Sequence, residues 1–124
     1  LTVVTNLNLT LVANTYYKFE FHINATSAIA DDFKFDLTAP ATLSGWMDWL
    51  CIQSSGIITG DFDSSDLTVD QVVLLTDSAF TIKVSGLVRS TGGGTFSIRC
   101  AKNADASGID LIIGTLSHSW AIAL

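Results

Sequence analysis

Residues 16–24 read Tyr16-Tyr17-Lys18-Phe19-Glu20-Phe21-His22-Ile23-Asn24, and this stretch indicates the fold class. Its large apolar side chains occupy every second position: Tyr17, Phe19, Phe21 and Ile23. Successive side chains of a β-strand point to opposite faces, so this alternation predicts a strand with one face in a core. In a helix the same four side chains would spread around the cylinder instead of forming a stripe. The stretch therefore predicts a strand with one buried face, around which an all-β protein is built.

The same alternation recurs along most of the chain. It predicts strands near Asn6–Val12, Tyr16–Asn24, Phe33–Leu37, Phe80–Val88, Phe96–Cys100, Ile109–Ile113 and Trp120–Leu124. About eight short strands, with turn residues roughly every 8–15 positions, are typical of an antiparallel β-sandwich. We expect a jelly-roll-like sandwich that forms a single domain over residues 1–124.

Several short segments predict how the strands are joined. Ala13-Asn14-Thr15 is a polar turn of residues that hydrogen-bond their own backbone. Pro40 ends a strand because proline has no N–H for a sheet ladder. Ser90-Thr91-Gly92-Gly93-Gly94 predicts a tight hairpin, and Gly86 predicts a bulge in the strand before it. Ala25–Asp32, small and polar, is expected to be a loop.

The middle third of the chain has the weakest pattern. Trp46 and Trp49 are three residues apart and fit one face of a short helix, while a strand over Trp49–Ile52 fits equally well. The serines, glycines and aspartates of Ser54–Asp66 predict an exposed loop. Leu67–Thr76 is rich in valine and leucine without alternation, which favours a strand buried on both faces.

The composition excludes some classes of function. The net charge is −6, and the six lysines and arginines are scattered singly, so no cationic cluster can neutralise nucleic-acid phosphates. No apolar run approaches the ~20 residues that span a bilayer, so we expect no membrane partner. Hydrophobic residues make up 48% and charged residues 15% of the chain, against about 25% charged in typical domains. So few charges predict either a large core or a surface hidden in an assembly.

The motifs that suggest a ligand have simpler explanations. Gly92-Gly93-Gly94 is followed by a predicted strand, whereas a phosphate-binding loop opens a helix. Asp61, Asp63, Asp66 and Asp70 offer the oxygen ligands that calcium prefers, but they lack the order and the closing glutamate of an EF-hand. We expect a solvated acidic loop, and calcium binding in it stays open.

Two cysteines and two histidines complete the candidate chemistry. Cys51 and Cys100 are too far apart in sequence for a metal pattern and are expected to be buried, with a disulfide between them left open. His22 and His118 lie nearly a hundred residues apart, and no G-x-S-x-G nucleophile motif accompanies them. We expect surface or interface histidines, no enzymatic activity and no cofactor.

Large aromatic residues are the candidates for an interface. Tyrosine and tryptophan are enriched where proteins bind one another, and the low charge content favours that role here. Filling the core of a sandwich is the alternative. The candidate interface residues are Tyr16, Trp46, Trp49 and Trp120.

Motifs at both ends of the chain resemble a known family. Leu9-Thr10-Leu11-Val12-Ala13-Asn14-Thr15-Tyr16-Tyr17-Lys18-Phe19-Glu20-Phe21 is followed by a strand that ends in a proline, Phe33–Pro40. Val84–Val88, a glycine turn and Gly94–Asn103 follow, then a looser match at Gly114–Trp120. This arrangement resembles small β-rich virion surface proteins of tailed bacteriophages. The resemblance implies capsid decoration or spike proteins, or domains of tail fibres and appendages, many of them trimeric. It brings no catalytic residues.

The sequence thus predicts a structural, non-enzymatic protein of a tailed-phage virion. We favour a homotrimeric decoration, or cement, protein on the head surface, because the chain has no fibrous repeat. Its expected partners are its sister copies and the major capsid protein or tail structural proteins. One alternative is a tail-fibre or tail-appendage domain in host attachment. A second is a carbohydrate-binding β-sandwich, with Trp46 and Trp49 beside the Asp61–Asp66 loop, and a third is a small hydrolase that uses His118.

Overall fold

The computed structural model describes residues 2–27, 32–64, 70–103 and 111–124, with the backbone alone for residues 2–6 and 61–64. The described residues form strands and no helix, which confirms the all-β class. The strands are β1 (Thr2–Leu11), β2 (Tyr16–Thr26), β3 (Phe33–Thr38), β4 (Leu43–Gln53), β5 (Gly56–Ser64), β6 (Gln71–Val73), β7 (Ala79–Ser90), β8 (Gly94–Lys102), β9 (Ile112–Ile113) and β10 (His118–Ala123).

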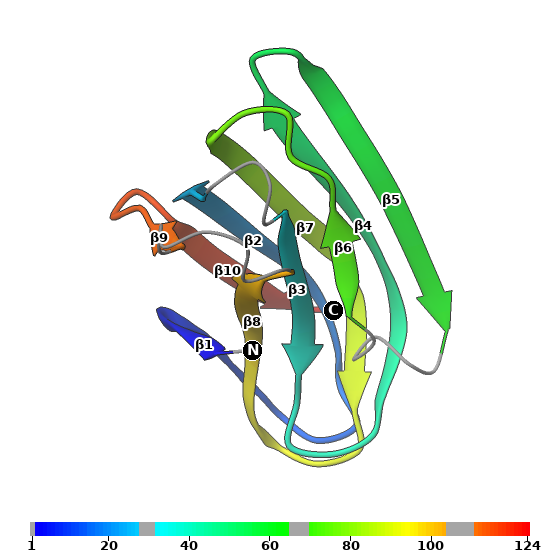
Figure 1. Ribbon diagram of the computed structural model, residues 1–124. Helices are drawn as coiled ribbons and strands as arrows, with labels where there is room; N and C mark the ends of the chain where they lie inside the picture. Colours follow the sequence, from blue (N-terminus) through cyan, green and yellow to red (C-terminus); the bar gives the residue numbers. More distant parts are fainter. Residues whose placement is uncertain (1, 28–31, 65–69, 104–110) are drawn as a thin grey trace.

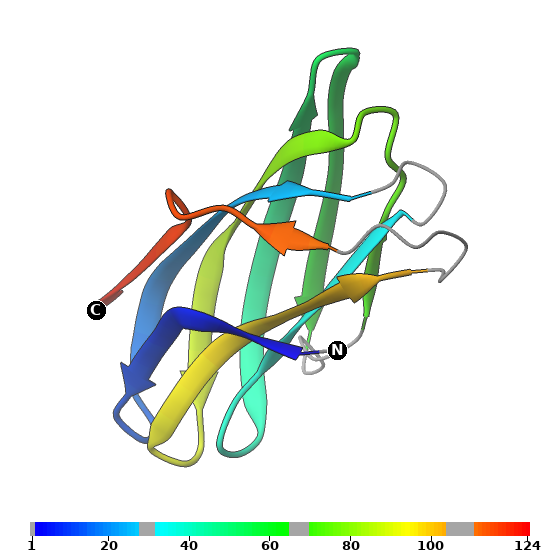
Figure 2. The same ribbon diagram turned by 60° about the vertical axis from the view of Figure 1, so that its left-hand side comes forward.

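Two antiparallel sheets pack face to face as a sandwich (Figures 1 and 2). Sheet A has the order β1-β8-β3-β6, and sheet B has the order β10-β2-β7-β4-β5, with β9 also paired to β2. Each of the first eight strands pairs with its counterpart from the other end of the series, β1 with β8 and so on inward to β4 with β5. This is the pairing of a jelly roll, an extended hairpin folded over on itself, and it confirms the predicted sandwich.

The predicted hairpin at Ser90–Gly94 is wrong, because β7 and β8 belong to different sheets. The glycine turn carries the chain across the sandwich, as do the connections from β1 to β2 and from β3 to β4, and the three meet at the bottom of Figure 1. The N–H of Asn14 donates to the Ser90 carbonyl at 2.8 Å, and the N–H of Thr91 donates to the Thr42 carbonyl at 3.1 Å. These bonds tie the three crossings together at one end of the molecule.

The bulge predicted at Gly86 is also wrong. Gly86 pairs with Phe19 of β2 and with Met47 of β4 in a register that continues unbroken on both sides. Glycine is required for another reason: a Cβ atom there would lie 2.0 Å from the backbone oxygen of Trp46. Gly86 therefore allows β4 to approach β7 closely, and the strand alternation runs on through it.

The middle of the chain contains more strand than its sequence indicates. Of the two readings of the tryptophan segment, the strand is correct, and it extends over β4. The exposed loop predicted over Ser54–Asp66 is wrong, because Ser54 and Ser55 alone form the turn and Gly56–Ser64 is β5. Among the described strands this one lies at the edge of sheet B and pairs with β4 alone, so it needs no continuous apolar stripe.

Three further boundaries differ from the prediction. The strand expected over Leu67–Thr76 is described only at Gln71–Val73, and its burial is one-sided: Val73 and Leu75 are buried while Val72 and Leu74 are exposed. Residues 67–69 lie outside the described part of the chain. β2 extends to Thr26, into the expected loop, whose residues 28–31 are also outside it. The strand predicted at Ile109–Ile113 is described at Ile112–Ile113.

The core lies between the two sheets and is rich in phenylalanine. The ring of Phe96 on β8 is 5.1 Å from that of Phe19 and 5.5 Å from that of Phe21, both on β2. Phe33 packs edge-on against Phe80 in the same way, again across the sandwich. The apolar stripe from Tyr17 to Ile23 thus forms one wall of the core, which leaves the polar residues between its members on the outer face of sheet B.

Candidate functional site

The outer face of sheet B carries most of the exposed apolar surface. Residues paired directly across antiparallel strands share a face, so the register places each residue. Seven of the eleven large hydrophobic residues that are exposed among the described residues lie on this face or at its border: Tyr16, Trp46, Ile52, Ile57, Ile112, Ile122 and Leu124. Exposed apolar side chains that gather on one face usually mark an interaction site.

One part of this surface, here called the edge patch, lies where β10 runs beside the start of β2. It consists of Tyr16, Trp120, Ile122 and Leu124. Tyr16, Ile122 and Leu124 are 52%, 60% and 73% exposed. The Leu124 N–H donates to the Tyr16 carbonyl at 3.0 Å, which fixes the end of the chain against β2.

Two cations border the edge patch. Lys18 is the register partner of Ile122. The guanidinium of Arg89 lies 5.9 Å from the centre of the Tyr16 ring, and its Nη2 donates to Oδ1 of Asn14 at 2.9 Å. The patch is therefore apolar at its centre, with Lys18 and Arg89 at its Tyr16 end and Glu20 opposite Trp120.

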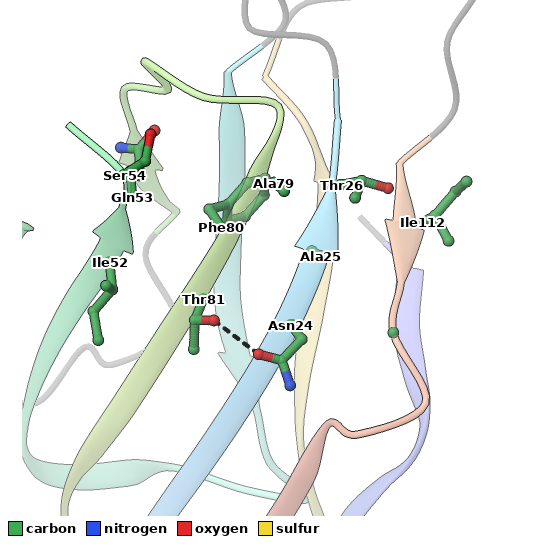
Figure 3. Close-up of a pocket in the computed structure, with 11 residues that line it drawn as sticks. Asn24, Ala25, Thr26, Ile52, Gln53, Ser54, Ala79, Phe80, Thr81 and Ile112 are labelled. Atoms are coloured by element: carbon green, nitrogen blue, oxygen red, sulfur yellow. Dashed lines mark hydrogen bonds between the residues drawn. The ribbon is translucent and has the colours of Figure 1, made fainter. Parts of the chain in front are cut away.

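A second apolar feature, here called the isoleucine groove, crosses the other end of the same face (Figure 3). It has a volume of about 520 Å³, and Ile52 of β4 and Ile112 of β9 stand on its two sides. On its floor the Thr81 hydroxyl donates to Oδ1 of Asn24 at 2.8 Å. Among the described residues that line the groove, none has a charged side chain.

The hairpin turn beside the groove is held rigidly. Oε1 of Gln53 accepts hydrogen bonds from the N–H groups of Thr76 at 2.6 Å and Asp77 at 2.9 Å, and its Nε2 donates to the Leu74 carbonyl at 3.1 Å. The Ser54 hydroxyl donates to the Asp77 carboxylate at 2.5 Å and lowers the pKa of that carboxyl. An anion therefore sits at this end of the face, fixed to the β4–β5 turn.

A polar row separates the two apolar features. The rings of His22 and His118 are stacked, with centroids 4.4 Å apart and planes 12° from parallel. Glu20 contacts His22 through Oε1, and its Oε2 lies 3.8 Å from Nζ of Lys83. The pairing of β2 with β10 brings together two histidines that are distant in sequence, which the sequence analysis did not foresee.

The histidines show no catalytic arrangement in the described part of the chain. Within the described residues, Nδ1 of His118 hydrogen-bonds only the Leu116 carbonyl, at 3.2 Å, and no serine or cysteine side chain hydrogen-bonds either ring. No group of three histidine, cysteine, aspartate or glutamate residues there is placed to hold a metal ion. Four aspartates were suggested as calcium ligands. Asp61 and Asp63 lie in β5, Asp70 precedes β6, and Asp66 lies outside the described residues.

A polar hollow of about 500 Å³ lies beside this row, over β5, β4 and β7. Its side chains include Asp48, Thr59, Lys83 and Ser85, around Leu50. Asp48, Thr59 and Ser85 make no side-chain hydrogen bond within the described residues, so their donors and acceptors are unused. Trp46 lies two residues from Asp48 on the same face.

Trp49 does not belong to this surface, which corrects its assignment to an interface. It is 7% exposed and packs edge-on against Phe35, with 5.9 Å between ring centroids. Its Nε1 donates to Oε1 of Gln71 at 3.3 Å, and a Cβ at Gly60 would meet its ring. Trp46 and Trp49 lie on opposite faces of β4, so the predicted platform of both tryptophans is not formed. The other three candidates, Tyr16, Trp46 and Trp120, do share the outer face.

The cysteines are free and buried, Cys51 in sheet B and Cys100 in sheet A. Burial raises the pKa of the Cys51 thiol to about 11 and that of Cys100 to about 12. Both thiols are therefore protonated at neutral pH and act as small apolar core residues.

Comparison with known proteins gives no relative for this arrangement. No protein-family profile, no curated protein and no solved structure matches the chain. Within the described residues no helix is long and apolar enough to span a membrane. The evidence for function is therefore the geometry of the outer face of sheet B together with the sequence motifs.

Proposed function

We propose that this chain is a structural protein of a tailed-phage virion, a homotrimeric decoration protein of the head surface. The observation that carries the proposal is the edge patch, where Tyr16, Ile122 and Leu124 are exposed together. The jelly roll is consistent with this role, since viral capsid proteins use it, although lectins and cupins do as well. The resemblance of the motifs at both ends of the chain to phage virion proteins favours the virion among these.

The size of the face suits a protein partner. Five strands about 4.8 Å apart, on average about ten residues long at ~3.4 Å per residue, present roughly 800 Å² in plan. A stable interface of standard size buries about 800 Å² on each partner. Covering this face with neighbouring copies would remove the exposed isoleucines, Leu124 and Tyr16 from water.

A decoration protein stabilises a shell by mass action. Only the assembled lattice presents its complete binding site, so binding favours the assembled state over free subunits. A trimer multiplies the effect, because one engaged subunit raises the local concentration of the other two.

Sedimentation of the purified chain tests the assembly. We expect a trimer at micromolar concentration, and we expect Ile122→Asp to dissociate it, because a carboxylate would be buried without a partner. Val72→Asp is the matched control: Val72 is also exposed on a strand, but in sheet A. A monomeric unmodified chain, or equal effects of the two variants, contradicts the proposal.

A second candidate function is recognition of a neutral sugar at the polar hollow. The unused groups of Asp48, Thr59 and Ser85 match hydroxyls that both donate and accept, and Trp46 beside them offers a stacking surface. Titration with neutral oligosaccharides such as maltotriose and chitotriose, followed by tryptophan fluorescence, tests this function. Saturable quenching that Asp48→Ala abolishes supports it, and a flat titration with every sugar rejects it.

A further inference from the structure

The edge patch and the isoleucine groove occupy opposite ends of one sheet face. Tyr16 begins β2, whereas Asn24, on the groove floor, lies eight residues further along the same strand. At ~3.4 Å per residue the two features are about 27 Å apart. They are therefore separate surfaces, each of which needs its own cover.

The charges that border the two surfaces differ in sign. Lys18 and Arg89 border the Tyr16 end of the edge patch, and the acid opposite Trp120, Glu20, is engaged by His22 and Lys83. Asp77 is fixed beside the groove through Ser54, a lining residue. Lys83, a cation on the same face, is engaged by Glu20. A cation-bordered apolar patch and an acid-bordered apolar groove are complementary in both hydrophobicity and charge.

We infer that the edge patch of one copy docks into the isoleucine groove of the next copy. This inference rests on the proposed self-assembly and names the two surfaces that meet. Ile122 and Tyr16 of one subunit pack between Ile52 and Ile112 of its neighbour, and Lys18 and Arg89 approach the acidic hairpin end.

Such a contact joins two different surfaces, so it is heterologous. Heterologous contacts close into rings when the rotation between neighbours permits, and a ring of three is the proposed trimer. Patch-to-patch contact about a two-fold axis would instead place Lys18 and Arg89 against their own copies. The repulsion between like charges disfavours that arrangement.

Two single variants distinguish the contacts. Ile122→Asp damages only the patch, and Ile52→Glu damages only the groove; the two chains differ in mass. In a sample of either variant alone, every copy keeps one intact surface, but no copy has the intact surface that would bind it. Native mass spectrometry should therefore show monomers. Mixed in equal amounts, the intact patch of Ile52→Glu meets the intact groove of Ile122→Asp, and a heterodimer containing one of each should form. Circular dichroism melts confirm that both variants remain folded.

The outcomes separate this inference from the proposed function. A mixture that stays monomeric, or a trimer that survives Ile52→Glu, overturns the docking of patch into groove. If both the wild-type chain and Ile52→Glu form trimers, self-assembly stands and uses other surfaces. A monomeric wild-type chain overturns both. Rising salt should weaken the heterodimer, because the bordering charges are screened.

Discussion

Replacing Phe96 by alanine tests the packing of the two sheets. Phe96 of β8 is 0% exposed, and its ring contacts those of Phe19 and Phe21 across the sandwich at 5.1 and 5.5 Å. Truncation of a buried phenylalanine costs about 3–5 kcal/mol, through lost transfer free energy and the cavity left behind. We therefore expect the free energy of unfolding to fall by about 4 kcal/mol. At roughly 3–5 °C per kcal/mol for a chain of this size, Tm should fall by about 12–20 °C.

Urea unfolding followed by tryptophan fluorescence measures the change. The matched control is Phe96→Leu, which keeps most of the volume and should cost less than about 1.5 kcal/mol. The slope of the transition should be unchanged in both variants, since the surface exposed on unfolding is nearly the same. A loss below about 1 kcal/mol for the alanine variant would refute the placement of β8 against β2.

Three other results are expected. Gly86→Ala should cost roughly 2 kcal/mol in a thermal melt, because its Cβ would meet the β4 backbone, and an unchanged Tm would contradict this packing. The hydrogen bond from Ser54 lowers the pKa of Asp77 in the folded state, so its contribution to stability is present above pH ~3.9 and disappears as pH falls through the folded pKa. Asp77→Asn should flatten the acid limb of the stability profile, and an identical limb would reject the bond. Because burial raises the pKa of both thiols, Cys51 and Cys100 should resist a disulfide reagent at pH 8 until the chain is unfolded in guanidinium; fast labelling of the native chain would show exposed thiols.

The sequence was sufficient to predict the strands whose bulky side chains all lie on the buried face. The stripe from Tyr17 to Ile23 and the pair Phe96 and Ile98 gave the correct core side because bulky and polar residues alternate there without exception. The glycine turn at Ser90–Gly94 predicts a hairpin that does not form, because alternation shows that a strand has a buried face but not which sheet it joins. Both β7 and β8 face the same core from opposite sides, so a crossing and a hairpin give the same local pattern.

The surface was harder to predict than the core. The alternation of Trp120, Ile122 and Leu124 correctly indicated a strand, but the core side of β10 is its small residue Ala121. Size therefore gave no indication of which side was buried. The same holds in β4, where the large Ile52 is exposed and its smaller neighbour Cys51 is buried. Only the register of the sheet reveals that these residues share one face.

Labelling of intact virions with antibody and gold tests directly whether the chain is a component of the phage head surface. The antibody should be raised against the folded chain and applied to purified phage particles that carry it, and electron microscopy then gives the position of the gold. Gold is expected over the head surface, in clusters that reflect three copies at each site. Particles that carry no gold on head or tail, while the same antibody detects the chain free in the lysate, would contradict a structural role in the virion.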